Sequence, residues 1–441
     1  MKTARDDIGG RLDRLPVTAL HLLAVVLCAT GFAFDTFELA LGGVLAAVFS
    51  VPPHAVAASE LSLLLASVYI GATIGAPAFG WVADRYGRRH TLMGLLIGLG
   101  LSSLAGAACQ SPAMLTLLRG VGGIAMGAYP PIVIAYLTDL MPPARRGMLI
   151  FSTAAFSALG PPAGIFLVRY LTPLQPLGLE AWRWGFIVGG VGVLLVGLLF
   201  RLLPESPRWL QLRGRTQQAQ AVLAAFERST VVLDAPAAKG AGARSPTDAV
   251  VRTPRRGHQF VVALIFLLSP WATVAFPILS GAVMAQKGYR LSDALLVLGL
   301  SWFGPMVGTL LASTSIDKLE RRQALGLCAC AMGLAGGCFV LGDGAAWLAT
   351  ASIAFALFSA LYVPTLTMYG AELFPTEARA RSVAAAWALN RVGAAVAPLL
   401  LLPLLRSSGA SAMFGAVALT LLASLLLLGL APRGRQRQAV G

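Results

Sequence analysis

Charged residues are scarce in this chain, and acidic residues are the scarcest of them. Only 12% of the 441 residues are charged, and 19 Asp or Glu stand against 34 Lys or Arg, which gives a formal net charge of +15. Hydrophobic residues make up 57% of the chain, and its mean hydropathy is +0.76. A soluble protein of this length keeps about 25% of its residues charged, so the composition excludes a soluble fold.

Histidine and cysteine are also rare. The four His residues are scattered, and no segment pairs a nucleophile with a base or gathers metal ligands. The five Cys residues all fall in apolar stretches, where we expect them to pack as small apolar residues. We therefore expect no enzyme active site, no metal site and no cofactor. A sensor would need a soluble output domain, and no segment is long enough for one.

Long apolar stretches are abundant. A helix that spans a bilayer needs about 20 apolar residues, and twelve such stretches follow one another along the chain. The expected spans are approximately 19–49, 60–83, 90–110, 113–138, 148–171, 183–203, 260–286, 292–314, 323–343, 345–369, 380–405 and 410–431. The sequence predicts an all-α polytopic membrane protein with 12 transmembrane helices in two six-helix bundles.

The basic residues are unevenly distributed between the loops. By our count 27 of the 34 lie on one set of loops and termini, five (Arg169, Arg183, Lys287, Arg290 and Arg406) lie on the other, and Arg119 and Arg391 lie within spans. This bias follows the positive-inside rule, so both termini are expected in the cytoplasm. No cleavable signal peptide is evident. We expect a multi-pass protein of the cytoplasmic (inner) membrane that attracts anionic lipids, binds no nucleic acid and is a monomer.

Two charged motifs recur at the same offset of 233 residues. Asp84, Arg85, Arg88 and Arg89 reappear as Asp317, Lys318, Arg321 and Arg322, and the pair Asp139 and Arg146 reappears as Glu372 and Arg379. Two unrelated motifs with one offset indicate that the chain consists of two homologous halves. We expect an N-terminal bundle over 1–203, a connector over 204–258 and a C-terminal bundle with a basic tail over 259–441.

The connector has two expected parts. Residues 206–229 carry an apolar stripe of helical period, which predicts a surface helix; the stripe comprises Leu210, Ala219, Val222, Leu223 and Phe226. Residues 234–257 lack this period and are rich in Ala, Gly, Pro and Arg, which predicts a flexible tether.

The motifs resemble those of the major facilitator superfamily. Gly80-x-x-x-Asp84-Arg85-x-Gly87-Arg88-Arg89 is similar to its loop 2–3 signature, and Pro204-Glu-Ser-Pro-Arg-Trp-Leu210 resembles a signature of its sugar-porter branch. Phe34-Asp35-Thr36-Phe37-Glu38 resembles a segment of its metabolite:proton symporters, which include aromatic-acid and nicotinate permeases. The resemblance covers about 20–430 and implies transport by alternating access.

The repeated charges suggest a gate on the cytoplasmic side. Carboxylates and Arg side chains at helix ends can form ion pairs that hold this side shut and break as the bundles rock. The alternative is positive charge that only sets topology, but this explains neither the glycines nor the recurrence of Asp317. The expected gate residues are Gly80, Asp84, Arg85, Gly87, Arg88, Arg89, Asp139, Arg146, Asp317, Lys318, Arg321, Arg322, Glu372, Arg379, Glu205 and Arg208.

Asp35 and Glu38 are the most unusual residues for their location. They share a face of one helix, and an ionised acid inside a membrane costs about 3 kcal/mol or more. Arg119 is the expected counter-ion, and one Arg against two acids leaves one carboxyl able to take up a proton. The alternative is a static charge network that fixes helix packing. Shifted by 233 residues, the three positions become Leu268, Trp271 and Ser352, none of them ionisable.

Candidate substrate-binding residues lie in the C-terminal half. Arg391 can bind an anion or be neutralised by helix carbonyls, and the sequence leaves both open. Trp271, Tyr362 and Trp387 are candidate aromatic contacts, although each is individually more typical of packing. The helix over 260–286 has no Gln cluster before its end, unlike the sugar-transporting relatives that the motifs resemble, which argues against a sugar.

We therefore expect a proton-coupled symporter of a small organic solute, an organic or aromatic acid, that works by alternating access. Its expected partners are the substrate, protons and the lipid bilayer. Gly147, Gly160-Pro161 and Gly164 coincide with part of a motif of antiporters in this superfamily, so an efflux antiporter is the alternative. A small-residue helix interface is the simpler interpretation of these glycines.

Overall fold

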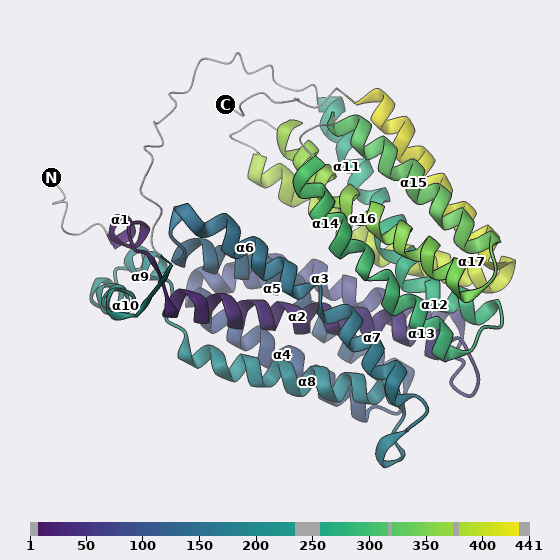
Figure 1. The fold of residues 1–441 in the computed structure, drawn as a ribbon, viewed down its shortest axis with the longest axis horizontal. Helices are drawn as coiled ribbons and strands as arrows, with labels where there is room; N and C mark the ends of the chain where they lie inside the picture. Colours follow the sequence, from purple (N-terminus) through teal and green to yellow (C-terminus); the bar gives the residue numbers. More distant parts are fainter. Residues whose placement is uncertain (1–7, 234–255, 316–319, 374–378, 432–441) are drawn as a thin grey trace.

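The computed structural model describes residues 8–233, 256–315, 320–373 and 379–431 and is almost entirely helical. Helices α2 to α8 form one bundle, and α11 to α17 form a second one beside it (Figure 1). The first part of the chain contains α1 (Ile8–Asp13), β1 (Val17–Thr18), α2 (Ala19–Val48), α3 (Ala58–Tyr86), α4 (Arg88–Ala108), α5 (Pro112–Leu140), α6 (Pro143–Ser157), α7 (Gly160–Leu171), η1 (Pro176–Gly178), α8 (Ala181–Leu199) and η2 (Phe200–Leu202). The connector contains α9 (Pro207–Leu212), α10 (Thr216–Arg228) and β2 (Val231–Leu233). The second part contains α11 (Arg256–Pro270), η3 (Trp271–Ala275), α12 (Phe276–Gln286), α13 (Leu291–Ser301), α14 (Phe303–Ser315), α15 (Arg321–Leu341), α16 (Ala345–Leu373) and α17 (Arg379–Leu430).

Eleven segments of the described chain are long and apolar enough to cross a membrane. The prediction of an all-helical polytopic membrane protein is confirmed in this form. Ten of these segments are 18–30 residues long, but the last, Ala385–Leu430, has 46 residues. Inside it Gly409 has φ +86°, a conformation outside the helical region that glycine adopts readily.

Glycines bring α3 and α5 into direct backbone contact. A Cβ at Gly71 or Gly75 would collide with the backbone of α5, and a Cβ at Gly123 or Gly127 would collide with the backbone of α3. Small residues allow this approach, because without a hydrophobic drive inside a bilayer helices associate through close packing. The close packing holds Arg119, on the same helix as Gly123, next to the interior of the first bundle.

The connector lies against one end of the first bundle, which we call the connector face (Figure 1). The predicted surface helix is present but divided into α9 and α10, because Gly214 between them has φ +73°. Leu210, Ala219, Leu223 and Phe226 of its stripe are buried, so the stripe packs on the protein. β1 and β2 pair antiparallel beside it. The predicted tether over 234–257 lies almost entirely outside the described residues.

The expectation for cysteine needs a correction. Cys28, Cys109 and Cys328 are buried, but Cys330 and Cys338 are exposed on the surface of the second bundle. The helix faces that meet lipid are as apolar as those that meet protein, so an apolar stretch alone does not predict burial.

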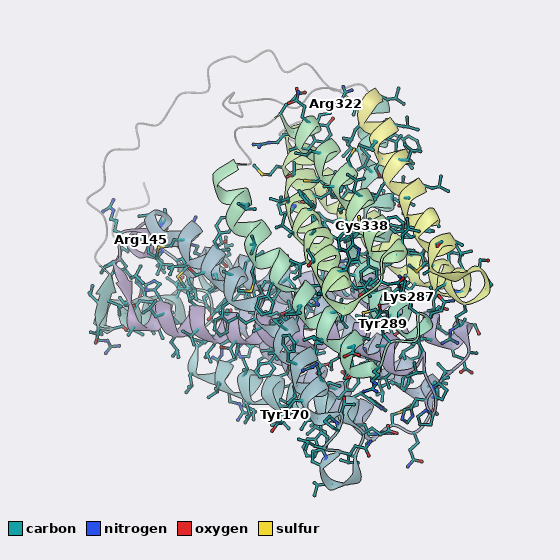
Figure 2. The ribbon with its side chains drawn as sticks, turned by 45° about the vertical axis from the view of Figure 1, so that its right-hand side comes forward. Arg145, Tyr170, Lys287, Tyr289, Arg322 and Cys338 are labelled. Atoms are coloured by element: carbon teal, nitrogen blue, oxygen red, sulfur yellow. The ribbon has the colours of Figure 1, made fainter. Side chains whose placement is uncertain are left out.

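The two bundles meet at the face opposite the connector, which we call the distal face. A Cβ at Gly281 of α12 would lie 2.9 Å from the Ala47 Cβ of α2, and one at Gly299 of α13 would lie 2.8 Å from the Phe166 ring of α7. On the connector side the bundles diverge (Figure 1). Figure 2 shows Arg145 of the first bundle and Arg322 of the second well separated there.

Candidate functional site

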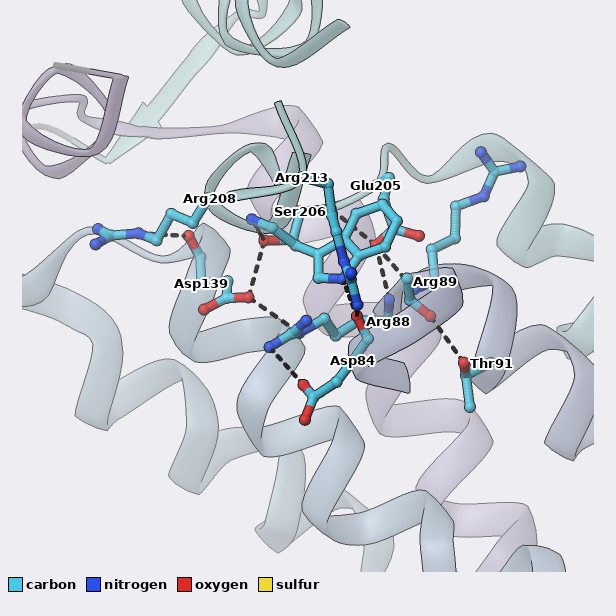
Figure 3. Close-up of polar contacts among 11 residues, drawn as sticks. Asp84, Arg88, Arg89, Thr91, Asp139, Glu205, Ser206, Arg208 and Arg213 are labelled. Atoms are coloured by element: carbon cyan, nitrogen blue, oxygen red, sulfur yellow. Dashed lines mark hydrogen bonds and ion pairs between the residues drawn. The ribbon is translucent and has the colours of Figure 1, made fainter. Parts of the chain in front are cut away.

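The first copy of the charged motif forms a network on the connector face (Figure 3). Arg88 lies at its centre, with Nη2 3.2 Å from Asp84 Oδ1 and Nε 3.4 Å from Asp139 Oδ2. The Ser206 hydroxyl donates to the same Asp139 oxygen at 2.8 Å. The network therefore joins the ends of α3, α4 and α5 to the start of the connector.

Glu205 caps the N-terminus of α4. Its Oε1 accepts hydrogen bonds from the backbone N–H groups of Arg88 at 2.9 Å and Arg89 at 3.1 Å. A carboxylate is favoured at this position because the helix dipole is positive there. Gly87 makes the contact possible, since it has φ +105° and a Cβ would overlap the Glu205 carboxyl group.

Other expected gate residues also face the first bundle or the connector. Arg146 and Arg208 contact Asp13 Oδ1 at 3.4 Å and 2.5 Å, and Arg89 Nε donates to the Phe200 carbonyl at 3.1 Å. Arg85 stacks on Trp81 and Tyr86, with 5.5 Å and 5.8 Å to the ring centroids. Their described contacts thus tie the connector and the N-terminal helix to the first bundle.

One part of the gate prediction does not fit the structure, and another part stays a prediction. Gly80 was expected to allow close helix approach, but a Cβ there would meet nothing within 4 Å, since the bundles diverge at this end. In the second copy Arg322 Nη1 donates to the Ala431 carbonyl at 3.3 Å, and Arg321 also has a partner. Asp317 and Lys318 lie outside the described residues, as do the side chains of Glu372 and Arg379.

Glu38 and Arg119 lie in the centre of the first bundle, 1% and 6% exposed. Arg119 Nη1 donates to the Glu38 carbonyl oxygen at 3.1 Å and lies 3.5 Å from Oε2. The Ser103 hydroxyl of α4 is in short hydrogen-bond contact with Glu38 Oε1 and lies 3.0 Å from the Phe186 carbonyl oxygen of α8. The Arg119 guanidinium also lies over the Phe186 ring, 5.5 Å from its centroid.

Asp35 is held differently from Glu38. It is 4% exposed, and its Oδ1 is buried without a hydrogen-bond partner in the described part of the chain. The charges of Arg391 and Glu38 both act on it. Arg391 belongs to α17, so the second bundle contributes a charge that acts on Asp35.

Tyr69 of α3 links the two parts of this centre. Its ring is 4% exposed and packs with Ala394 and Ala395 of α17. It interacts electrostatically with both Arg119 and Arg391. A cavity of about 10 Å³ beside it is lined by Arg119 and Gly42, and a second of about 10 Å³ adjoins Glu38 and Ser103. Each is about the size of one water molecule.

The predicted aromatic contacts occupy different environments. Trp271 is half-buried in the π-helical turn η3, and turns of this kind often occur at functional sites. Trp387 is half-buried and packs edge-on against Phe266, with the ring centroids 5.8 Å apart. Tyr362 is 1% exposed, and its hydroxyl is buried without a hydrogen-bond partner in the described part of the chain.

Sequence reasoning missed Ser103, Tyr69 and Ser206. Ser206 lies inside a recognised motif, so its position beside Glu205 could have drawn notice. Ser103 and Tyr69 stand alone in apolar helices, where nothing in the sequence distinguishes them from neighbouring packing residues. The described residues contain no group of three or more His, Cys, Asp or Glu able to hold a metal ion.

Residues 23–398 match the sequence profile of the Major Facilitator Superfamily, which is most of the chain. The chain belongs to this superfamily. Its members are membrane transporters, so the predictions of the family and of a transporter rather than an enzyme are confirmed. Gly160 and Gly164, which also fit the antiporter pattern, lie against Ala33 and Phe37 of α2 as a helix interface requires.

Named relatives within the superfamily carry different cargoes. The arabinose-proton symporter of Bacillus subtilis is 30% identical over 229 residues, which is 49% of this chain and about half (48%) of that protein. The gallate transporter of Pseudomonas putida is 27% identical over 414 residues, 88% of this chain and 86% of that protein. The inward-open xylose transporter XylE from E. coli has the same fold, with a TM-score of 0.71 and 18% identity over 95% of this chain and 98% of that one.

Proposed function

We propose that this protein is a proton-coupled symporter of a small organic acid, with an aromatic acid as the preferred substrate. The observation that carries the proposal is a group of two buried carboxyls, the buried Arg119 and the half-buried Arg391, to which both bundles contribute. A charge is costly to bury unless it is paired or titrates. A group of this kind is suited to exchange both a proton and an anion.

Glu38 is the proposed proton carrier. When it is ionised, Oε1 accepts the hydrogen bond of the Ser103 hydroxyl. When it is neutral, its O–H can donate to Ser103, whose hydroxyl then turns to the Phe186 carbonyl oxygen 3.0 Å away. Since a hydroxyl can both donate and accept, rotation of one hydroxyl serves both protonation states.

Protonation of Glu38 changes what Arg119 is paired with. Neutral Glu38 no longer balances the guanidinium, which keeps its bond to the Glu38 carbonyl oxygen and its stacking on Phe186. Its remaining charge then favours an anion. In this order the proton binds to Glu38 first and the carboxylate of the substrate binds second, which is the basis for symport. Asp35, with its unpartnered Oδ1 and the nearby Arg391, is the second proposed coupling group.

An acid is favoured over a sugar as the substrate. Arg391 lies where the two bundles meet. Within the described residues its side chain donates no hydrogen bond to a helix carbonyl, so its charge is available to bind an anion. Trp271, Trp387 and Tyr362 are the proposed ring contacts. The gallate transporter, whose substrate is an aromatic carboxylate, supports this choice, because its similarity extends over 88% of this chain.

Alternating access is proposed to move residues 1–203 and 259–441 as two units. The 46 residues of Ala385–Leu430 are taken as two crossings that turn at Gly409, which gives twelve in all. The excess of Lys and Arg on the connector face supports the proposal that this face and both termini lie in the cytoplasm. On this basis the structure is inward-open, and the connector-face network is proposed to meet the second copy of the motif when the protein turns outward.

Uptake into proteoliposomes with an imposed pH gradient tests the proposal. We expect a radiolabelled aromatic acid such as benzoate or gallate to accumulate when the interior is alkaline. Asp35→Asn and Glu38→Gln should each lower accumulation at least tenfold, because neither amide binds a proton in this range. At least one variant should retain substrate exchange without a gradient, which separates coupling from binding.

The other outcomes are informative. Uptake that ignores the pH gradient would remove the proton role, and normal accumulation by both variants would make the carboxylates structural. Acid-driven export from loaded vesicles would favour the efflux antiporter. Accumulation of arabinose or xylose with no response to acids would replace the substrate class while leaving proton coupling intact.

A further inference from the structure

Most of the basic side chains on the distal face bind backbone carbonyl groups. Arg183 Nη1 donates to the carbonyls of Ala107 at 2.7 Å and Cys109 at 2.6 Å, and Lys287 Nζ donates to Gly342 at 2.6 Å. Both stay within one bundle, where they satisfy carbonyl groups left open at helix C-termini. Their role is to cap helices.

Arg169 and Arg406 instead cross from one bundle to the other. Arg169 Nε of α7 donates to the Ser292 carbonyl oxygen of α13 at 3.0 Å. Arg406 of α17 donates through Nη1 to Val56 and through Nη2 to Phe49, the latter at 3.2 Å, and both acceptors lie in the turn between α2 and α3. Each bundle thus contributes one arginine to the backbone of the other.

The two arginines are related by the internal repeat. The 233-residue offset takes Arg169 to Leu402, and Arg406 lies four residues further on, one turn along the same helix face. The same offset relates Ser292 to Ser59, three residues after Val56. Donors and acceptors therefore occupy corresponding places in the two halves, at the two edges of the distal seam where α7 meets α13 and where the α2–α3 turn meets α17.

We propose that Arg169 and Arg406 form a paired latch that holds the distal side of the transporter closed. The latch consists of three hydrogen bonds from guanidinium groups to carbonyl oxygens. Because the two points lie at opposite edges of the seam, a rotation that opens the distal side breaks both. Charge-assisted bonds are stronger than neutral ones, so the latch favours the closed state over and above the glycine packing of the seam.

The chemistry of the latch separates it from the coupling site. Neither a guanidinium nor a backbone carbonyl changes its charge between pH 5 and 9. The donors and acceptors of the distal latch therefore take up no proton themselves, in contrast to Glu38 and Asp35. The titratable groups beside them are His54, in the same turn as the Phe49 and Val56 acceptors, and Glu180, whose Oε1 lies 3.2 Å from His54 Nε2. The latch shifts the equilibrium between the distal-open and distal-closed states toward the closed state by a fixed amount, and binding of the proton and substrate shifts it back. This inference rests on the family and the contacts, not on the proposed substrate.

Distance measurements between spin labels test the latch in the full-length protein. Labels on Leu177→Cys, 87% exposed in the distal loop of the first bundle, and Asp343→Cys, in a distal turn of the second, report the distal opening. The five native cysteines are replaced by alanine in this background. We expect Arg169→Gln with Arg406→Gln to raise the ratio of distal-open to distal-closed protein about tenfold, and each single change to have a smaller effect. In an Asp35→Asn, Glu38→Gln background, where neither coupling carboxyl can titrate, the double arginine variant should raise the ratio by the same factor at acidic and at neutral pH.

Arg290→Gln is the matched control. Arg290 lies beside Arg169 on the same face, but its side chain makes no hydrogen bond or ion pair within the described residues. Removal of its charge should leave the ratio unchanged. An equal shift with Arg290→Gln, or none with the double variant, would overturn the proposal. If the double variant does not fold, Arg406→Lys decides, because lysine is shorter and has one nitrogen where the guanidinium uses two, so it should bind the two carbonyls less well. An unchanged ratio contradicts the latch, and an intermediate one supports it.

Discussion

At the scale of single residues, the Ser103 hydroxyl determines which hydrogen bonds Glu38 can make. It has one hydrogen and two close oxygen partners, Glu38 Oε1 and the Phe186 carbonyl. A carbonyl only accepts, so when Ser103 donates to Phe186 its contact with Glu38 requires a proton on the carboxyl. The serine therefore offers a hydrogen-bond partner to both forms of the acid.

Replacement of Ser103 by Ala should slow proton-driven uptake about tenfold, because the carboxyl then loses its partner in both forms. Exchange without a gradient should be affected less, since Arg119 stays in place. Ser102→Ala is the matched control: Ser102 adjoins the same cavity but donates to the Leu99 carbonyl at 2.8 Å and does not contact Glu38. Initial uptake rates at several external pH values measure both variants, and equal rates for the two would exclude a specific role for Ser103.

Charge made part of this centre predictable from the sequence. Asp35, Glu38 and Arg119 stand out because an ionisable group inside a membrane helix is costly and needs a reason. Ser103 does not stand out, because a serine in an apolar helix usually satisfies itself on a carbonyl one turn back, as Ser102 does. The electrostatic effect of Arg391 on Asp35 also escaped prediction, since the two residues are more than 350 positions apart in the sequence.

At the scale of elements, the junction of α3, α4 and the connector depends on one backbone conformation. Gly87 ends α3 and begins α4 with φ +105°, and the Glu205 carboxyl group occupies the space where a Cβ would be. The connector is thereby fastened to the N-terminus of α4. The motif was predictable from its spacing, but its partner was not, because nothing in the local pattern says where the connector docks.

Gly87→Ala should destabilise this junction. The positive φ alone costs an alanine about 1–2 kcal/mol, and the displaced Glu205 loses its bonds to the helix end. Gly80→Ala serves as the control, because it lies in the same motif where a Cβ meets nothing within 4 Å. Thermal unfolding of the two purified variants in detergent should show a lower midpoint for Gly87→Ala only. A midpoint equal to that of Gly80→Ala would mean that Glu205 is not held as described.

At the scale of the whole molecule, the connector face and the distal face contain different kinds of contact. The connector face carries carboxylates, arginines and a helix cap, all within the first bundle and its connector. The distal face is closed by glycine packing and by arginines on carbonyls. The duplication was predictable from two motifs at one offset. The closure of the distal face was not predictable, since small residues occur within a bundle, between bundles and toward lipid.

The distal side can close only if the residues where the two bundles meet stay small. Gly299 of α13 lies against the Phe166 ring of α7, where even a Cβ would be too close at 2.8 Å. Gly299→Leu should therefore hold the distal side open and reduce transport at least tenfold, while substrate can still bind from that side. Gly333→Leu, in α15 with nothing within 4 Å, should transport normally. The same pair of spin labels on Leu177→Cys and Asp343→Cys measures the opening.

The leucine and the latch can also be tested together. Because the leucine side chain already prevents closure, adding Arg169→Gln and Arg406→Gln to Gly299→Leu should open the distal side no further. An additional opening in the triple variant would mean that Gly299→Leu alone does not prevent closure and that the arginines still hold part of the protein closed.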